Sequence, residues 1–168
     1  MPDEGFITLN ISVTGTQQLT RKIQTFGTKI SDLTPAWERI AEDFRQDFRE
    51  QFSTEGAFIA KKMAWAPLRP STVRDRISKG YFGEHPILYR TGRLMRSFTD
   101  KNSPGNITYI TPTELSIGSN YWTAAWMHFG TPKVVSRPIA GLSWKRRSGI
   151  VDRIREFVDE QIKAAGLN

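Results

Sequence analysis

The chain of 168 residues contains no cysteine and only two histidines, His85 and His128. Without thiols it has no disulfide bond, thiolate metal site or cysteine nucleophile, as is typical of proteins made in a reducing cytoplasm. Two histidines are also too few for a histidine-rich metal site. Phosphate-binding glycine-rich loops and the Gly-x-Ser-x-Gly and His-Glu-x-x-His motifs are missing as well. We therefore expect no catalytic residue, no metal and no cofactor, and predict that the protein is not an enzyme.

Long apolar runs are missing too. No stretch approaches the roughly 18 apolar residues that cross a membrane, and the mean hydropathy is −0.45. The first residues include Asp3 and Glu4, where a secretory signal needs basic side chains. With 38% hydrophobic residues, the chain is long enough for one core. The prediction is a single globular domain over residues 1–168, with no membrane span and no export.

Basic residues are in excess, but they are unevenly distributed. The formal net charge is +7, and residues 61–101 alone hold ten Lys or Arg against three Asp or Glu. Residues 1–60 instead hold nine acidic and six basic residues. Clustered cations gain affinity for phosphate by releasing counterions, which would suit a nucleic acid. A basic surface that is solvated, or that contacts an acidic protein partner, is the interpretation that we favour.

Apolar periodicity predicts the first three elements. Residues 6–13 alternate between apolar and polar side chains, as in a half-buried strand. A helix capped by Thr16 is expected over residues 16–30 and should pack on the sheet. The next helix should have Thr34 as its cap and end at Gly56. Its opposite face is charged, and its apolar stripe consists of Trp37, Ile40, Ala41, Phe44, Phe48 and Phe52.

A compact unit is expected in the middle of the chain. Residues 106–111 and 114–118 should pair as a hairpin around a short turn that contains proline. Short helices within residues 88–98 and 121–130 should flank the hairpin on either side. Leu94 is expected in the core, so that aspartate at this position should unfold the domain.

The remaining segments complete the expected fold. Residues 57–86 form a long basic loop that contains a short helix capped by Ser71. Residues 141–145 are a possible strand, and Ser148 should cap the last helix. The predicted class is α+β: a small antiparallel sheet packed by two or three amphipathic helices, with a long, partly irregular basic loop.

Two kinds of side chain have both a functional and a structural interpretation. His128 could act as a general base, but its aromatic neighbours favour a packed or interface histidine. Tryptophans can stack on bases, yet they more often anchor cores and protein interfaces. The second interpretation is favoured for Trp65, Trp122, Trp126 and Trp144.

Several short fragments follow one another along the chain in a characteristic order. They are Trp65-x-Pro67-Leu68 with Ser71-Thr72, then Ile87-Leu88-Tyr89-Arg90-Thr91-Gly92-x-Leu94-x-x-Ser97, then Ile117-Gly118, Tyr121-x-x-x-x-Trp126-x-His128-x-Gly130 and Ser136-Arg137-Pro138. As an ordered set they resemble the virion morphogenesis or tail-completion family of tailed bacteriophages. The similarity covers residues 34–162, and residues 6–33 lie outside it.

The resemblance implies a structural protein of the head–tail junction. Similar proteins have an α+β fold and assemble as a ring, commonly of six copies, on the end of the tail tube. They make the tail competent to join a DNA-filled head. The implied partners are further copies of this chain, tail-tube or terminator proteins, head-completion or connector proteins, and double-stranded DNA that passes without sequence specificity. The implied location is the neck of the virion, after assembly in the host cytoplasm.

Within that interpretation, the basic loop and the charged face of the second helix are expected to contact neighbouring proteins. The candidate interface residues are Trp65, Pro67, Leu68, Arg69, Tyr81, Phe82, Glu42, Arg45 and Arg49. The candidates for facing a DNA channel are Lys61, Lys62, Arg74, Arg76 and Lys79. The alternative is a stand-alone nucleic-acid-binding module that uses the basic segment 61–101.

Overall fold

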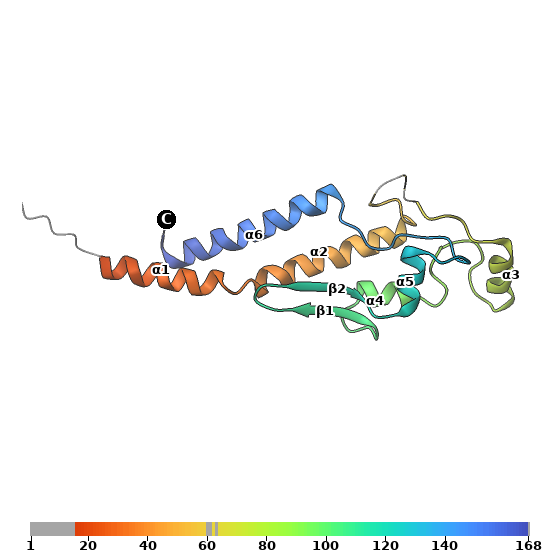
Figure 1. The fold of residues 1–168 in the computed structure, drawn as a ribbon, viewed down its shortest axis with the longest axis horizontal. Helices are drawn as coiled ribbons and strands as arrows, with labels where there is room; N and C mark the ends of the chain where they lie inside the picture. The colour runs from red at the N-terminus through yellow and green to blue at the C-terminus, as the bar shows by residue number, and fades with distance from the viewer. Residues whose placement is uncertain (1–15, 60–61, 63, 168) are drawn as a thin grey trace, which may run out of the picture.

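The computed structural model describes residues 16–59, 62 and 64–167, and the strand predicted over residues 6–13 lies outside them. The described residues form six helices and one antiparallel pair of strands (Figure 1). The elements are α1 (Thr16–Ile30), α2 (Thr34–Ser53), α3 (Pro70–Ser78), α4 (Arg93–Thr99), β1 (Asn106–Ile110), β2 (Leu115–Ser119), α5 (Trp122–Phe129) and α6 (Trp144–Ala165). The predicted α+β class with a small antiparallel sheet is confirmed.

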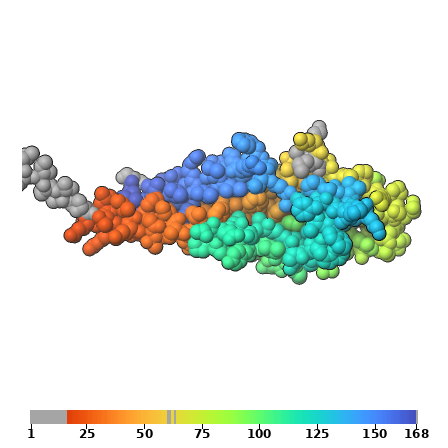
Figure 2. Space-filling model, viewed as in Figure 1, coloured from red at the N-terminus to blue at the C-terminus, as the bar shows by residue number. Residues whose placement is uncertain are grey.

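The molecule is elongated, because α1, α2 and α6 all run along its long axis (Figure 1). Figure 2 shows α1 at one end and the segment around α3 at the other. The predicted packing of α1 on the sheet is wrong: α1 lies against α6, and Lys22 Nζ donates to the carbonyl of Gly166 at 2.9 Å. Leu19 and Ile23 on α1 remain about half exposed, at 52% and 53%.

Charged side chains join α6 to α2. Arg146 Nη2 donates to Asp47 Oδ1 at 2.6 Å, and Arg153 Nε donates to Asp43 Oδ2 at 3.0 Å. The carboxylates raise the pKa of Arg146, chiefly through the hydrogen bond with Asp47. The acidic residues on the polar face of α2 therefore hold another helix of the same chain in place.

Three of the predicted helix caps are wrong. Thr34 is the first residue of α2 instead of its cap, and its backbone N–H donates to Asp32 Oδ1 at 2.9 Å. α3 begins at Pro70, so Ser71 lies inside the helix. α6 begins at Trp144, earlier than expected, because the Oγ of Ser143 accepts from the N–H of Arg146 at 3.1 Å. This early start also replaces the possible strand over residues 141–145.

The hairpin forms as predicted, with Asn106 opposite Ser119 and Ile110 opposite Leu115. One face of the sheet lies on α2 and α4, and the other face exposes Ile107 and Tyr109. The core continues from the covered face between α2, α4 and α5. Its buried cluster consists of Phe48, Phe52, Trp65, Ile87, Phe98, Ala124 and Ile139.

Candidate functional site

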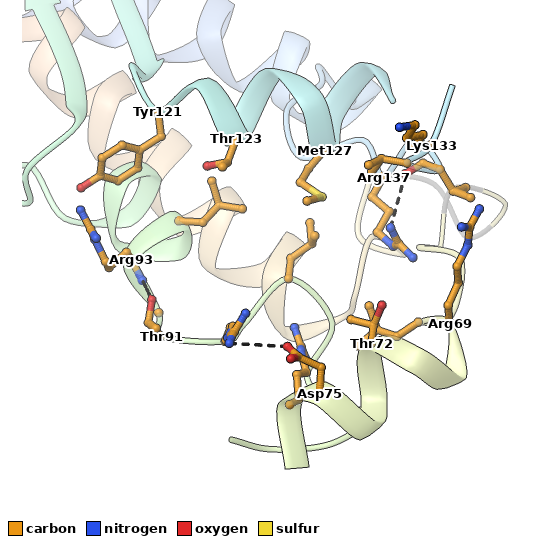
Figure 3. Close-up of a pocket in the computed structure, with 18 of the residues that line it drawn as sticks. Arg69, Thr72, Asp75, Thr91, Arg93, Tyr121, Thr123, Met127, Lys133 and Arg137 are labelled. Atoms are coloured by element: carbon orange, nitrogen blue, oxygen red, sulfur yellow. Dashed lines mark hydrogen bonds and ion pairs between the residues drawn. The ribbon is translucent and has the colours of Figure 1, made fainter. Parts of the chain in front are cut away.

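A groove of about 600 Å³ opens at the end of the molecule that carries α3. We call it the basic groove. Figure 3 shows α5 on one side and α3 on the other, with Thr123 and Met127 facing Thr72 and Asp75. The lining residues are Pro67, Leu68, Arg69, Thr72, Asp75, Arg76, Leu88, Arg90, Thr91, Gly92, Arg93, Leu94, Tyr121, Trp122, Thr123, Met127, Lys133, Val134, Val135 and Arg137.

The charges around the basic groove are nearly all positive. Its cationic residues are Arg69, Arg76, Arg90, Arg93, Lys133 and Arg137, whereas Asp75 is its single carboxylate. Asp75 already binds Lys79 through a short hydrogen bond and lies 3.6 Å from Arg90. Within the described part of the chain, no ion pair neutralises the other five cations. An anionic group that enters the groove would therefore be attracted from several sides.

Two of these arginines are buried and bind only main-chain carbonyls among the described residues. Arg76 is 5% exposed, and its Nη1 donates to the carbonyl of Pro86 at 3.1 Å. Arg137 is 7% exposed, and it donates to the carbonyls of Ala66 and Pro67, each at 2.9 Å. Burial lowers the pKa of both groups. Because arginine stays charged, both positive charges remain without a carboxylate in a partly desolvated wall.

The floor of the basic groove is apolar. Leu68, Leu88, Leu94 and Met127 line the groove and pack against the buried core cluster from outside. Apolar side chains below and cations around the rim suit a ligand that combines hydrophobic and acidic groups. Tyr121 adds an aromatic wall, with the Arg93 guanidinium 5.5 Å from its ring centroid.

Leu94 is only partly buried, which corrects its expected place in the core. We expect Leu94→Asp to lower the free energy of unfolding by about 1 to 3 kcal/mol, without unfolding the domain. The new carboxylate would face water and the cations of the groove. Asparagine has nearly the shape of aspartate but no charge, so Leu94→Asn should lower the free energy of unfolding at least as much as Leu94→Asp does. Urea denaturation of both variants checks this, and a much larger loss for aspartate would contradict it.

The segment 136–140 ties several distant parts of the chain together. The carbonyl of Pro138 accepts from Gln51 Nε2 at 2.9 Å and from Trp65 Nε1 at 2.8 Å. The N–H of Arg137 donates to the carbonyl of Met127 at 2.6 Å. The segment therefore fixes α2, α5 and the chain around residues 65–67 relative to one another behind the groove.

His128 takes part in the same network as a hydrogen-bond acceptor. Its Nδ1 accepts from the backbone N–H groups of Ile139 and Ala140, at 3.1 and 3.3 Å. Burial lowers the pKa of His128 below its ordinary value of 6.5. The His128 side chain thus holds the backbone of residues 139–140, and only a neutral ring can accept these two hydrogen bonds.

This role makes the stability depend on pH. The unfolded chain binds a proton at His128 more readily than the folded chain does. The contribution of His128 is therefore complete above about pH 6.5 and is lost as the pH falls below that value. His85 acts oppositely, because its contact with Glu55 raises its pKa.

In a His85→Gln background, we expect the free energy of unfolding to fall between pH 7.5 and pH 5.5. The glutamine amide oxygen can accept the same two hydrogen bonds and does not titrate. Adding His128→Gln to this background should therefore remove the part of the decrease that is due to protonation of His128. Chemical denaturation at several pH values measures both. An unchanged pH profile would show that His128 does not titrate in this range.

The predicted interface residues of the basic loop separate into two groups. Pro67, Leu68 and Arg69 line the basic groove. Trp65 does not reach the surface: it is 5% exposed and packs edge-on against Phe52, with ring centroids 5.3 Å apart. The prediction that Trp65 is an interface residue is therefore wrong, because its ring is part of the buried core cluster.

Tyr81 and Phe82 follow α3. Tyr81 is 37% exposed and lies under the Arg90 guanidinium, 4.8 Å from its ring centroid. Phe82 is 67% exposed. Both residues are accessible to a partner at this end of the molecule, near the basic groove.

The three candidates on α2 bind one another. Glu42 accepts from Arg45 Nε at 2.9 Å and from Arg49 Nη2 at 3.2 Å. These bonds, chiefly the one with Arg45, lower the pKa of Glu42. Glu42 and Arg49 are exposed, but Arg45 is 8% exposed, so it is not an outer interface residue.

The candidates for facing DNA do not form one surface. Lys61 lies outside the described residues, while Lys62 and Arg74 are exposed. Lys79 is paired with Asp75. The prediction that Arg76 faces DNA is wrong, because Arg76 is buried and donates to the carbonyls of Gly83 and Pro86.

Most of the groove residues were not among the predicted site residues, including all but two of its cations and both of its aromatic residues: Arg90, Arg93, Lys133, Arg137, Tyr121 and Trp122. These six come from three separate segments, residues 90–93, 121–122 and 133–137. Arg90, Tyr121 and Arg137 are named residues of the ordered fragments, which was the available signal. Gly92, also in a fragment, has φ +73°, and a Cβ there would lie 2.8 Å from Arg96 Nη1. This conformation explains the glycine before α4.

Within residues 16–59, 62 and 64–167, no group of three or more His, Asp or Glu residues is placed to hold a metal ion. None of the helices in this part of the chain is both long and apolar enough to cross a membrane. Comparisons with models of known protein families, with curated proteins and with solved structures found no match to this chain.

Proposed function

We propose that this protein is a structural subunit of the neck of a tailed bacteriophage, and that it acts in tail completion and head–tail joining. The observation that carries the proposal is that the fragments on which the resemblance rests meet in space. Trp65 donates to the carbonyl of Pro138, and Arg137 donates to the carbonyl of Ala66, so these two segments are bound to each other. Leu88, Gly92 and Tyr121 line the adjacent groove. Fragments spread over residues 65–138 thus lie at one site, which supports a common role for them.

The surface supports self-association. Fourteen large hydrophobic residues of the described part of the chain are exposed, including Phe129 at 78% and Trp144 at 83%. They occur on α1, α5 and α6, on the hairpin, around α3 and in the segment between α5 and α6. Scattered apolar residues are common on monomers, but Trp122 and Trp126 on α5 lie with ring centroids 4.1 Å apart and are 62% and 49% exposed, and adjoining exposed aromatic rings of this kind are typical of protein interfaces. In a closed ring each subunit uses two different surfaces, and an elongated subunit offers two separated ends.

The basic groove suits a protein partner better than DNA. A volume of about 600 Å³ accommodates a few amino-acid side chains, whereas a DNA duplex would need a much wider surface. We therefore assign the groove to an acidic face or segment of a neighbouring neck protein. DNA in the channel would meet only exposed cations such as Lys62 and Arg74, through weak contacts that allow it to pass.

Mass measurement in solution and electron microscopy test the proposal. We expect the purified chain to form rings, commonly of six copies, and to copurify with tail tubes when both are present. In an electrophoretic mobility shift assay at physiological salt, the protein should bind duplex DNA weakly. A stable monomer that binds DNA tightly and stoichiometrically would instead favour the alternative, a stand-alone nucleic-acid-binding module.

A further inference from the structure

The sheet is incomplete as it stands. β1 and β2 pair only with each other among the described residues, which leaves one free edge on each strand. In Figure 1, β1 lies along the border of the molecule. A two-stranded sheet is marginally stable, and a free edge is a ready template for another strand. The outer edge of β1 is therefore a candidate surface for pairing with an extended segment.

The surface next to this edge has two distinct faces. Ile110, Leu115 and Ile117 lie on the side that covers α2 and α4, whereas Ile107 and Tyr109 lie on the exposed side. A strand added here would need alternating side chains, apolar toward the helices and polar or small toward solvent.

Residues 6–13 of the same chain have this alternation. Ile7, Leu9, Ile11 and Val13 share one face, and Thr8, Asn10 and Ser12 share the other. The pattern predicts a strand of a sheet that is buried on one side. The hairpin on α2 and α4 is the one sheet of the described residues, and it is buried on one side.

The chain geometry argues against pairing within one molecule. From its last residue, Ile30, back to its first, Thr16, α1 runs away from the hairpin (Figure 1). The hairpin turn lies at the junction of α1 and α2, where Leu33 N–H donates to the carbonyl of Pro112 at 2.9 Å. The 15 residues of α1 span about 22 Å. A chain returning along α1 at about 3.3 Å per residue would use about seven residues before it reached the turn.

We propose that residues 6–13 of one copy add as a third strand to the free edge of β1 in a neighbouring copy. Ile7, Leu9, Ile11 and Val13 would then extend the apolar layer over α2 and α4, and Thr8, Asn10 and Ser12 would lie beside Ile107 and Tyr109. The inference rests on the self-association of the proposed function and does not depend on the phage assignment. It gives the ring a directional link from each subunit to the next.

The absence of cysteine allows a direct test by cross-linking in the full chain. Disulfides form where two Cα atoms are about 4.4 to 6.8 Å apart, as across adjacent strands. We combine Tyr109→Cys, at an exposed position, with Thr8→Cys, Asn10→Cys or Ser12→Cys in three double variants. Under mild oxidation at least one should give a ladder of covalently linked chains on a non-reducing gel.

Matched variants use the opposite face of the added strand. Ile7→Cys, Leu9→Cys or Ile11→Cys, each with Tyr109→Cys, should give at least tenfold less cross-linked product. A disulfide within one chain, or equal cross-linking from both faces, would overturn the strand assignment. Absence of any cross-link in all three double variants, while the chain still associates, would overturn it as well.

A proline variant gives a second readout. Ile11→Pro removes a backbone donor from the added strand and should shift the mass of the assembly to that of the monomer, with unchanged circular dichroism. Glu4→Pro lies before the strand and should leave the mass unchanged. If Ile11→Pro also leaves it unchanged, the strand exchange is wrong but the ring is not. If the wild-type chain is monomeric throughout, the self-association in the proposed function fails.

Discussion

Replacing Phe98 with alanine is expected to lower the free energy of unfolding by about 3 to 5 kcal/mol, the largest effect of any single truncation considered for this chain. Phe98 is 6% exposed on α4, and its ring centroid lies 5.0 Å from that of Phe48 and 6.3 Å from that of Phe52. Alanine would leave a cavity where α4 packs on α2. Because the hairpin also rests on these two helices, the loss should affect the whole central unit.

Equilibrium denaturation in urea measures this loss. Phe129→Ala is the matched control, since it removes the same atoms from a ring that is 78% exposed. That variant should stay within about 0.5 kcal/mol of wild type when measured on the monomer. A cost below about 1.5 kcal/mol for Phe98→Ala would show that α4 is not packed as the structure has it.

Replacing Arg137 with alanine is expected to cost about 2 to 4 kcal/mol, although it removes a charged residue from a strongly basic protein. The guanidinium donates to the carbonyls of Ala66 and Pro67, and the side chain is 7% exposed. Its removal leaves both carbonyls, which lie in partly buried hydrogen bonds, without this donor. It also releases the segment that carries Pro67 and Leu68, which line the basic groove.

Thermal unfolding measures this effect, with an expected decrease in Tm of roughly 4 to 16 °C. Arg147→Ala, at an exposed position on α6, controls for the change in net charge and should leave Tm nearly unchanged. Arg137→Lys should be intermediate, because an ammonium group cannot reproduce the two diverging bonds. Equal stability of Arg137→Ala and wild type would show that Arg137 does not hold the groove wall.

Local patterns were sufficient for the helices and the hairpin of the described residues, although not for residues 141–145, where a possible strand was expected and α6 begins. The apolar stripe of α2 and the two short strands around a proline-containing turn identify their elements from neighbouring residues alone. The helix ends were less predictable, because several hydroxyl side chains lie near each end. Ser143 and Ser148 are both suitable cap residues by type. Ser143 is the cap of α6, because its Oγ accepts the hydrogen bond from the backbone N–H of Arg146.

The exposure of individual side chains was the main source of error at the site. Arg45, Arg76 and Trp65 are residue types that often lie at interfaces, yet each is buried here. Arg76 is buried because the carbonyl of Pro86 is presented to it by a loop that returns from beyond α3. A linear sequence does not show which carbonyls meet which guanidinium, so this outcome was not predictable.

The sequence by itself determined the class of the protein: an α+β chain without cysteine, with a short hairpin, amphipathic helices and a basic middle segment. These properties depend on residue types and short spacings. Only the tertiary structure decided that Arg69, Arg93, Lys133 and Arg137 surround one groove with an apolar floor. Long-range packing determines which segments contact one another and which charged side chains are buried. Neither can be predicted from short sequence patterns, because both depend on residues that are far apart in the chain.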